Sequence, residues 1–314
     1  MIALPGTEIQ KKYDLAFAWN WPYDGGFVRL LQRVCAGHHV SLLEVTPNNL
    51  DPVLCDLEKS TIQFNTFLDR AADSDAQFSP LCDWASLHCK YVFNPAEKTT
   101  RANNKALMHY ALIRAGLQTP FTIILPSYQS NPSLPEIDLA LLKNHFAIKP
   151  SHGGGSEGVV TDAQHPEQIQ SARQQFPEDD YLLQATIHPA NLEGKQAWFR
   201  VLYCCDHVYP CWWHTETHQY KPLSFDESSV LHLERLKDIS RQIGALIELD
   251  LFSSEIAFTE EGQFVVVDYV NDPIDLRLQS EATDGVPDEI VAGIANTLAD
   301  WVSHINPKPA QIKS

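Results

Sequence analysis

The stretch NHFAIKPSHGGGSEGVV, residues 144–160, joins an apolar strand to a lysine and then to a loop rich in glycine. Glycine lets backbone amides approach anionic oxygens without interference from a Cβ atom, and the lysine adds a mobile positive charge. A strand and loop of this kind can wrap a polyphosphate. The residues that carry the pattern are Lys149, Gly153, Gly154, Gly155 and Gly158.

Two common phosphate-binding motifs are excluded at this stretch. A Walker A loop needs its lysine after the glycines, whereas Lys149 precedes them. The G-x-G-x-x-G order and the strand-to-helix context of a dinucleotide-binding fingerprint are also missing. A Gly-rich hairpin in an ordinary sheet remains the alternative to a phosphate site.

The composition is that of a globular, acidic chain. Its 314 residues are 44% hydrophobic and 20% charged, with a formal net charge of −17. Such a charge repels nucleic acid, and no basic run offsets it, so we expect no nucleic-acid partner. Any phosphate site must be a focused pocket of a few Lys and Arg side chains, aided by a divalent cation.

The N-terminus and the cysteines indicate a cytoplasmic location. MIALPGTEIQKKYDL lacks the apolar core and the cleavage site of a signal peptide, and no segment has the length of a membrane span. We therefore expect no membrane partner. The seven cysteines form no C-x-x-C pair, so neither a disulfide framework nor a zinc site is expected.

The order of apolar runs predicts an α/β fold, with α+β character in the C-terminal part. A strand over 13–19, a helix over 27–35 and the strand HVSLLEV suit a small parallel αβ domain. The later runs predict a helix ending at Gly116, the strand YLLQATI, the hairpin of WFRVLYCC and VYPCWWH, a helix over 229–246, the hairpin of LFSSEIAFT and QFVVVDYVN, and a helix over 289–305. We expect three parts, 1–95, 96–190 and 191–314.

From about residue 95 to 305 these elements and their polar residues resemble the ATP-grasp superfamily, and the preceding domain is similar to the one usually found before that fold. The resemblance implies two lysines on the ATP phosphates, a Gly-rich loop that closes over them, and adenine beside a hinge strand. Lys105 in NNKALMH, ahead of AGLQTPFT, matches the first lysine, although Asn104 replaces the usual aspartate. Lys149 matches the second. The other nucleotide-binding positions implied are Gly153, Gly154, Gly155, Ser156 and Gly158 in the loop, Gln184, Ala185 and Ile187 at the hinge, and Glu193 at the ribose.

Two carboxylates on the late hairpin predict a metal site. Glu255 interrupts LFSSEIAF, Asp268 ends QFVVVD, and a hairpin through TEEGQ brings them together. Adjacent carboxylates repel unless they share a proton or a cation, and Mg²⁺ with oxygen ligands satisfies them; the alternative is two exposed carboxylates on a sheet face. The resemblance adds Asn271, which reaches the same ion only through a bulge or strand end, with Asp272 as a substitute.

Further residues are candidates for substrate binding. Arg200, on the apolar strand AWFRVLY, must form a salt bridge or bind an anionic ligand, and the resemblance favours a phosphorylated or carboxylate group of the substrate. Arg277 either binds an anionic substrate or pairs with Asp275. The resemblance also makes His214 and Tyr220 substrate candidates. A zinc site at His214, Glu216 and His218 is an alternative that lacks a further ligand.

The resemblance implies an ATP- and Mg²⁺-dependent ligase that joins a carboxylate to an amine through an acylphosphate, with Lys149 and Arg200 in catalytic roles. The expected substrates are small-molecule or peptide-like acids and amines, and a homodimer fits relatives of this fold. One alternative is an ATP-grasp kinase acting on a hydroxyl, which the shortage of basic residues disfavours. The other is a nucleotide-binding protein without turnover.

Overall fold

The computed structural model describes residues 11–143, 145–155 and 157–307. The chain forms two compact units. Among the described residues, the first unit contains 11–96, 249–251 and 275–307, and the second contains 97–248 and 252–274. The three-part division expected from the sequence remains a prediction.

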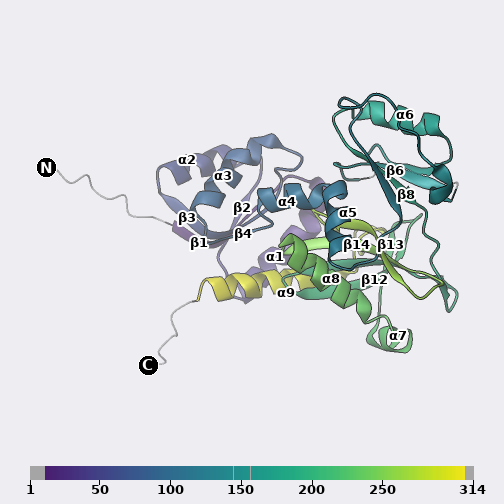
Figure 1. The fold of residues 1–314 in the computed structure, drawn as a ribbon. Coiled ribbons are helices and arrows are strands. Elements are labelled where there is room, and N and C mark those ends of the chain that lie inside the picture. Colours follow the sequence, from purple (N-terminus) through teal and green to yellow (C-terminus); the bar gives the residue numbers. More distant parts are fainter. Residues whose placement is uncertain (1–10, 144, 156, 308–314) are drawn as a thin grey trace. The chain divides into compact units, whose positions relative to one another are not determined.

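The first unit is built on a four-stranded sheet with the order β2-β1-β3-β4, in which every pairing is parallel (Figure 1). Its elements are β1 (Lys11–Trp19), η1 (Pro22–Asp24), α1 (Gly25–Gly37), β2 (Leu42–Val45), α2 (Leu50–Glu58), β3 (Ile62–Arg70), η2 (Ala76–Phe78), α3 (Ser79–His88), β4 (Tyr91–Phe93) and α9 (Asp288–Ile305). The predicted parallel αβ domain is confirmed. Strand β3 and the helices α2 and α3 were not predicted from the sequence.

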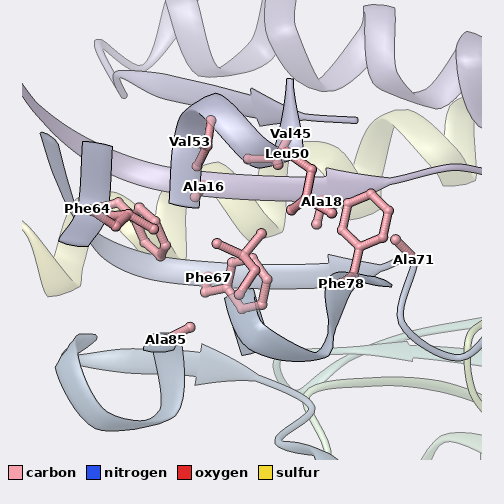
Figure 2. Close-up of a cluster of buried hydrophobic side chains, with 12 residues drawn as sticks. Ala16, Ala18, Val45, Leu50, Val53, Phe64, Phe67, Ala71, Phe78 and Ala85 are labelled. Atoms are coloured by element: carbon pink, nitrogen blue, oxygen red, sulfur yellow. The ribbon is translucent and has the colours of Figure 1, made fainter. Parts of the chain in front are cut away.

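The core of this unit forms around β1. Its residues 15–18 are all fully buried, as expected for a parallel strand covered on both faces. Figure 2 shows part of the cluster, including Phe64, Phe67 and Phe78 from the neighbouring segments. Helix α9 packs against α1, so the first unit combines an early and a late segment of the chain.

The second unit contains two larger antiparallel sheets and a two-stranded ribbon. One sheet has the order β5-β8-β6-β7, the other β13-β12-β11-β14-β15, and β9 pairs with β10. Its elements are α4 (Ala96–Asn103), α5 (Lys105–Arg114), β5 (Thr122–Leu125), η3 (Leu139–Leu142), β6 (Phe146–Pro150), β7 (Val160–Ala163), α6 (Pro166–Gln175), β8 (Tyr181–Ala185), β9 (Asn191–Leu192), β10 (Lys195–Gln196), β11 (Trp198–Cys204), β12 (His207–His214), β13 (Gln219–Pro222), α7 (Phe225–Val230), α8 (Arg235–Ile247), β14 (Leu251–Phe258) and β15 (Phe264–Asn271). The α/β class with an α+β C-terminal part is confirmed.

The single helix predicted over 229–246 is wrong, because two helices cover this region. A capping box between Ser224 and Glu227 starts α7 earlier than expected. The left-handed backbone of His232, with φ 55°, then interrupts the helical path, and Leu233 is fully buried. Within the described ranges, no helix combines the length and the apolar composition needed to cross a membrane.

Candidate functional site

Lys149 lies on β6 and is held by a neutral amide of the adjacent strand. The β6–β8 register places Lys149 opposite Leu182, so Gln184, two residues farther along β8, shares its face of the sheet. The ammonium donates to Gln184 Oε1 at 2.7 Å. Gln184 is only 2% exposed. The hydrogen bond to a neutral amide therefore fixes the side chain of Lys149, and among the described residues no carboxylate forms an ion pair with it.

Lys105 begins α5, and its ammonium also reaches the Gly-rich loop. Its Nζ donates to the carbonyl oxygen of Gly153 at 2.5 Å. Burial lowers the pKa of Lys105 below its ordinary value; Asp268 opposes this change and the nearby ammonium of Lys149 adds to it. The two lysines predicted to bind phosphate thus lie close enough for the ammonium of Lys149 to lower the pKa of Lys105.

Asn104 and His152 join the start of the loop to α5. The Oδ1 atom of Asn104 accepts from Leu107 N at 2.9 Å as the helix N-cap, while its Nδ2 lies 3.2 Å from His152 Nε2. On the other side of the ring, His152 Nδ1 lies 2.5 Å from Asp179 Oδ1. An aspartate at position 104 has no N–H to donate to His152, which gives the departure from the family pattern a physical reason.

The glycines of the loop serve two different purposes. Gly158 has φ 69°, and a Cβ atom there would collide with the ring of Phe176. At Gly154 the φ is not positive, and a Cβ would meet no described atom within 4 Å. Folding therefore requires glycine at 158, whereas a Cβ atom at 154 would be accommodated without a clash. Gly153 and Gly155 have positive φ with open space around them, and Ser156 lies outside the described residues.

The hinge positions lie at the end of β8. This strand is central, between β5 and β6, and Ala185 N donates to Phe121 O at 2.9 Å. Ile187 lies beyond the last strand residue. Glu193 is exposed at the turn between β9 and β10, where its φ is 51°. The contribution of these residues to nucleotide binding stays a prediction.

The acidic hairpin has the register that the sequence predicts. Glu255 on β14 lies opposite Asp268 on β15, and Ser253 lies opposite Asn271. Between these pairs β14 advances by two residues and β15 by three, so an extra residue bulges from β15. Since Ser253 and Glu255 share a face, the bulge brings Asp268 and Asn271 onto that face as well. Asp272 instead accepts a hydrogen bond from Thr99 Oγ1 at 3.0 Å.

Arg200 on β11 is ion-paired with Glu255, and the two side chains are 13% and 17% exposed. Its Nε donates to Ser253 Oγ at 3.1 Å, and its guanidinium carbon lies 5.3 Å from the ring centre of Trp213. Burial works against the charge of Arg200, but Glu255 and the other nearby acidic groups keep its pKa above the ordinary value. The salt bridge is one of the two arrangements expected for this residue, and it relieves part of the repulsion between Glu255 and Asp268.

The residues at the hairpin fit a hard divalent cation. Asp268 is partly buried, and its carboxylate makes no hydrogen bond or ion pair within the described residues. It lies in the field of the cations Lys105 and Arg200. With Glu255 and the amide oxygen of Asn271 it offers an all-oxygen donor set of the kind magnesium prefers. In the described part of the chain, no group of three or more His, Cys, Asp or Glu side chains is arranged to hold a metal.

The substrate candidates occupy different surroundings. Tyr220 on β13 is 6% exposed and packs on Trp213, whose ring also faces Arg200. His214 is exposed, and its Nδ1 accepts from Thr217 N at 3.2 Å. Arg277 belongs to the first unit. It pairs with Asp275, as one of the two interpretations expected, and also with Asp284, with shortest distances of 2.8 and 3.0 Å.

Two residues of the site were missed by the sequence analysis. Tyr269 Oη accepts from Gln184 Nε2 at 3.1 Å and lies 2.7 Å from His109 Nδ1. Sequence spacing held a signal for each, since Tyr269 follows Asp268 and His109 is one helical turn beyond Lys105. A buried hydrogen-bonded chain thus starts at Lys149 and ends at His109.

Neither a protein-family model nor a curated protein sequence matches the chain. Solved structures are similar over nearly its whole length. They include a RimK domain protein ATP-grasp from Sphaerobacter thermophilus DSM 20745 (18% identity, 91% of this chain and 98% of that chain, TM-score 0.61), the ATP-grasp ligase PsnB complexed with minimal precursor, Mg and ADP (12%, 94% and 99%, 0.60), and D-alanine–D-alanine ligase from Bacillus anthracis complexed with ATP (13%, 94% and 97%, 0.61).

These likenesses cover both units, and at 12–18% identity they establish the fold. The resemblance inferred from Lys105, Lys149 and the acidic hairpin is thereby confirmed at the level of architecture. The chain has the ATP-grasp fold.

Proposed function

We propose that this protein is an ATP- and Mg²⁺-dependent ligase that joins a carboxylate to an amine through an acylphosphate. The observation that carries the proposal is the charge arrangement of the second unit. The ammonium groups of Lys105 and Lys149 adjoin the Gly-rich loop, and the Asp268 carboxylate, which has no hydrogen-bond or ion-pair partner among the described residues, lies in the field of Lys105. The similar structures of ligases complexed with ATP, or with Mg and ADP, support this assignment.

The residues divide into three groups by what they would bind. Lys105, Lys149 and the backbone of the loop through Gly158 would hold the phosphates, with Ser156 in the same loop. Gln184, Ala185, Ile187 and Glu193 would surround the nucleoside. Glu255, Asp268 and Asn271 would hold Mg²⁺, which neutralises phosphate charge when it is bound.

The reaction would proceed in two steps, phosphoryl transfer and then amide formation. A carboxylate oxygen of the acid attacks the γ-phosphorus of ATP, the bond to the β-phosphate oxygen breaks, and ADP leaves. The neutral amine then attacks the acyl carbon, the bond to the phosphate oxygen breaks, and phosphate leaves; the proton lost by the amine nitrogen passes to the departing phosphate or to solvent as the amide forms. Because water would hydrolyse the acylphosphate, closure of the loop around Gly153 and Gly155 would protect it.

Arg200 would stabilise the oxygens of the transferring phosphoryl or acyl group. Its guanidinium is held by Glu255, Ser253 and the Trp213 ring. A side chain fixed on several sides needs little reorganisation during the reaction. Tyr220, packed on the same tryptophan, and His214 would lie on the acceptor side, where small-molecule or peptide-like substrates bind.

Isothermal titration of ATP into the full-length protein, with and without Mg²⁺, tests the nucleotide site. The wild type should bind ATP more tightly with Mg²⁺, and Lys149→Ala should weaken binding by more than about tenfold, because it removes a charge-assisted hydrogen bond. Lys90→Ala, an exposed lysine of the first unit, is the matched control and should bind as the wild type does.

Turnover tests the reaction class. Pairs of amino acids and short peptides, offered as acid and amine, should release ADP and phosphate in equal amounts together with a joined product. A phosphorylated product without joining would instead identify a kinase. A folded wild type that binds no ATP at millimolar concentration would overturn the proposal.

A further inference from the structure

We propose that Tyr269 and His109 are positioning residues for ATP binding, acting on Lys149 through a buried chain of hydrogen bonds that runs by way of Gln184. The inference rests on the proposed function, because Lys149 is taken to bind phosphate. Neither Tyr269 nor His109 would touch the nucleotide. Their role is to fix the amide that holds the ammonium of Lys149.

The chain has one consistent direction. An ammonium can only donate, so Lys149 Nζ donates to Gln184 Oε1 at 2.7 Å, and this sets the orientation of the amide. Gln184 Nε2 then donates to Tyr269 Oη at 3.1 Å. The tyrosine hydroxyl has its own proton left to donate, and His109 Nδ1 lies 2.7 Å away to accept it. Thr122 is a further hydrogen-bond partner of the tyrosine; in the proposed chain the hydroxyl proton goes to His109 Nδ1, which requires the neutral tautomer of His109 with its proton on Nε2.

Burial makes this direction costly to disturb. The three uncharged members, His109, Gln184 and Tyr269, are 5%, 2% and 2% exposed. Burial lowers the pKa of His109, which favours its neutral form. Removal of one hydroxyl would leave Gln184 Nε2 and His109 Nδ1 without their partner, and the amide would lose its fixed orientation.

The chain also connects four elements that each carry a candidate site residue. His109 is on α5, which begins with Lys105, and Tyr269 follows Asp268 on β15. The other two members are on β6 and β8, the strands of the phosphate lysine and the hinge. A single chain of buried hydrogen bonds thus fixes the relative positions of the two lysines, the hinge strand and the acidic hairpin. Apolar packing alone would fix them less specifically.

ATP binding by the full-length protein at constant Mg²⁺ tests the positioning role. Tyr269→Phe and His109→Leu should each weaken ATP binding by about three- to tenfold, since the first removes the buried hydrogen bonds to Gln184 and His109 and the second removes the one to Tyr269. His109→Gln keeps an acceptor for the tyrosine hydroxyl and should restore binding to within about twofold of the wild type. Tyr110→Phe, an exposed neighbour of His109, is the matched control and should have no effect.

Nitrogen NMR of protein labelled at its histidines supplies a readout that a merely structural role would not move. The ring signals of His109, assigned by their loss in His109→Gln, should show an unprotonated Nδ1. Addition of ATP should shift these signals in the wild type but not in Tyr269→Phe.

The outcomes separate the two proposals. If Tyr269→Phe is folded, binds ATP as the wild type does and leaves the His109 signals responsive, the positioning role is wrong while the proposed function stands. A protonated Nδ1 would also overturn it. If Tyr269→Phe does not fold, equal ATP binding by His109→Leu and His109→Gln decides against the chain. A wild type without ATP binding removes the proposed function and the positioning role together.

Discussion

A buried ion pair of the first unit contrasts with two partly buried charges of the second unit, Lys149 and Asp268, that form no ion pair among the described residues. In the first, Arg70 donates to both oxygens of Asp24 at 2.8 and 2.9 Å, and the two side chains are 4% and 1% exposed. In the second, Lys149 is held by a neutral amide, and the Asp268 carboxylate has no hydrogen-bond or ion-pair partner in the described residues. A buried charge that is fully paired can serve the fold alone. A charge without a counterion lowers stability unless a bound ligand supplies the counterion. The contrast therefore assigns the Arg70–Asp24 pair to the stability of the fold, and Lys149 and Asp268 to the candidate binding site.

The largest expected effect concerns the paired charge. Arg70→Met should destabilise the protein by about 3–5 kcal/mol, because it leaves the Asp24 carboxylate buried and unpaired. Urea unfolding of the full-length protein measures the change. The matched control is Arg29→Met, since the Arg29–Glu281 pair is 63% and 48% exposed and should contribute less than about 1 kcal/mol. Equal stability of the two variants would contradict the comparison.

Buried polar residues whose hydrogen-bond partners are remote in the sequence explain which part of the fold could not be predicted. Alternation and apolar runs predicted β1 and the acidic hairpin, but β3 was missed because IQFNTFLDR contains Asn65 and Thr66. Both are buried, and their partners are remote: Asn65 donates to Asn306 at 2.6 Å, and Thr66 donates to the carbonyl of Asp14 at 2.6 Å. Polar residues satisfied by distant chain segments look like loop residues in a local pattern.

The same limit applies to the candidate site. Lys105 and Lys149, the two lysines proposed to bind phosphate, could be selected as candidates from local spacing, because each adjoins a recognisable strand, loop or helix start. The link between His109 and Tyr269 was not, since 160 positions separate them and each has an ordinary function in a helix or strand core. The ion pair of Arg200 with Glu255 spans 55 positions and was foreseen only as one of two possibilities.

Asp268→Asn should remove a carboxylate charge that has no hydrogen-bond or ion-pair partner among the described residues. We expect ATP binding without Mg²⁺ to be unchanged and the gain from Mg²⁺ to fall by about 10- to 100-fold, as for other changes at metal sites. Titrations at several Mg²⁺ concentrations measure the gain. Asp162→Asn, at an exposed carboxylate that pairs with His145, is the control. An unchanged Mg²⁺ dependence in Asp268→Asn would show that the hairpin does not hold the ion.

The lowered pKa of Lys105 predicts an alkaline limit to ATP binding. Because its folded-state pKa is below the unfolded value, Lys105 destabilises the fold when protonated, and this penalty disappears as pH rises through the folded pKa. ATP binding changes in the opposite sense, since the neutral amine no longer attracts phosphate. ATP affinity, measured between about pH 8 and 10.5, should therefore begin to fall at a pH below the ordinary pKa of lysine. It should then fall by up to about tenfold per pH unit.

Lys105→Arg distinguishes this cause from other alkaline effects. The guanidinium stays charged throughout the range, so the variant should retain its affinity where the wild type loses it. A decline of equal steepness in both proteins would assign the alkaline limit to a group other than Lys105.

The smallest expected effect separates folding from binding within the Gly-rich loop itself. Gly154→Ala should stabilise the protein by about 0.4–1 kcal/mol, because its φ is not positive, its Cβ meets no described atom and the unfolded chain loses freedom. The same methyl should weaken ATP binding by about fivefold, the equivalent of one lost backbone contact. Gly158→Ala should instead destabilise the fold, since it strains a φ of 69° and presses on Phe176. Urea unfolding and ATP titration of both variants give the two quantities. If Gly154→Ala binds ATP as well as the wild type does, the backbone at 154 does not approach the phosphates, and glycine there has no role in binding.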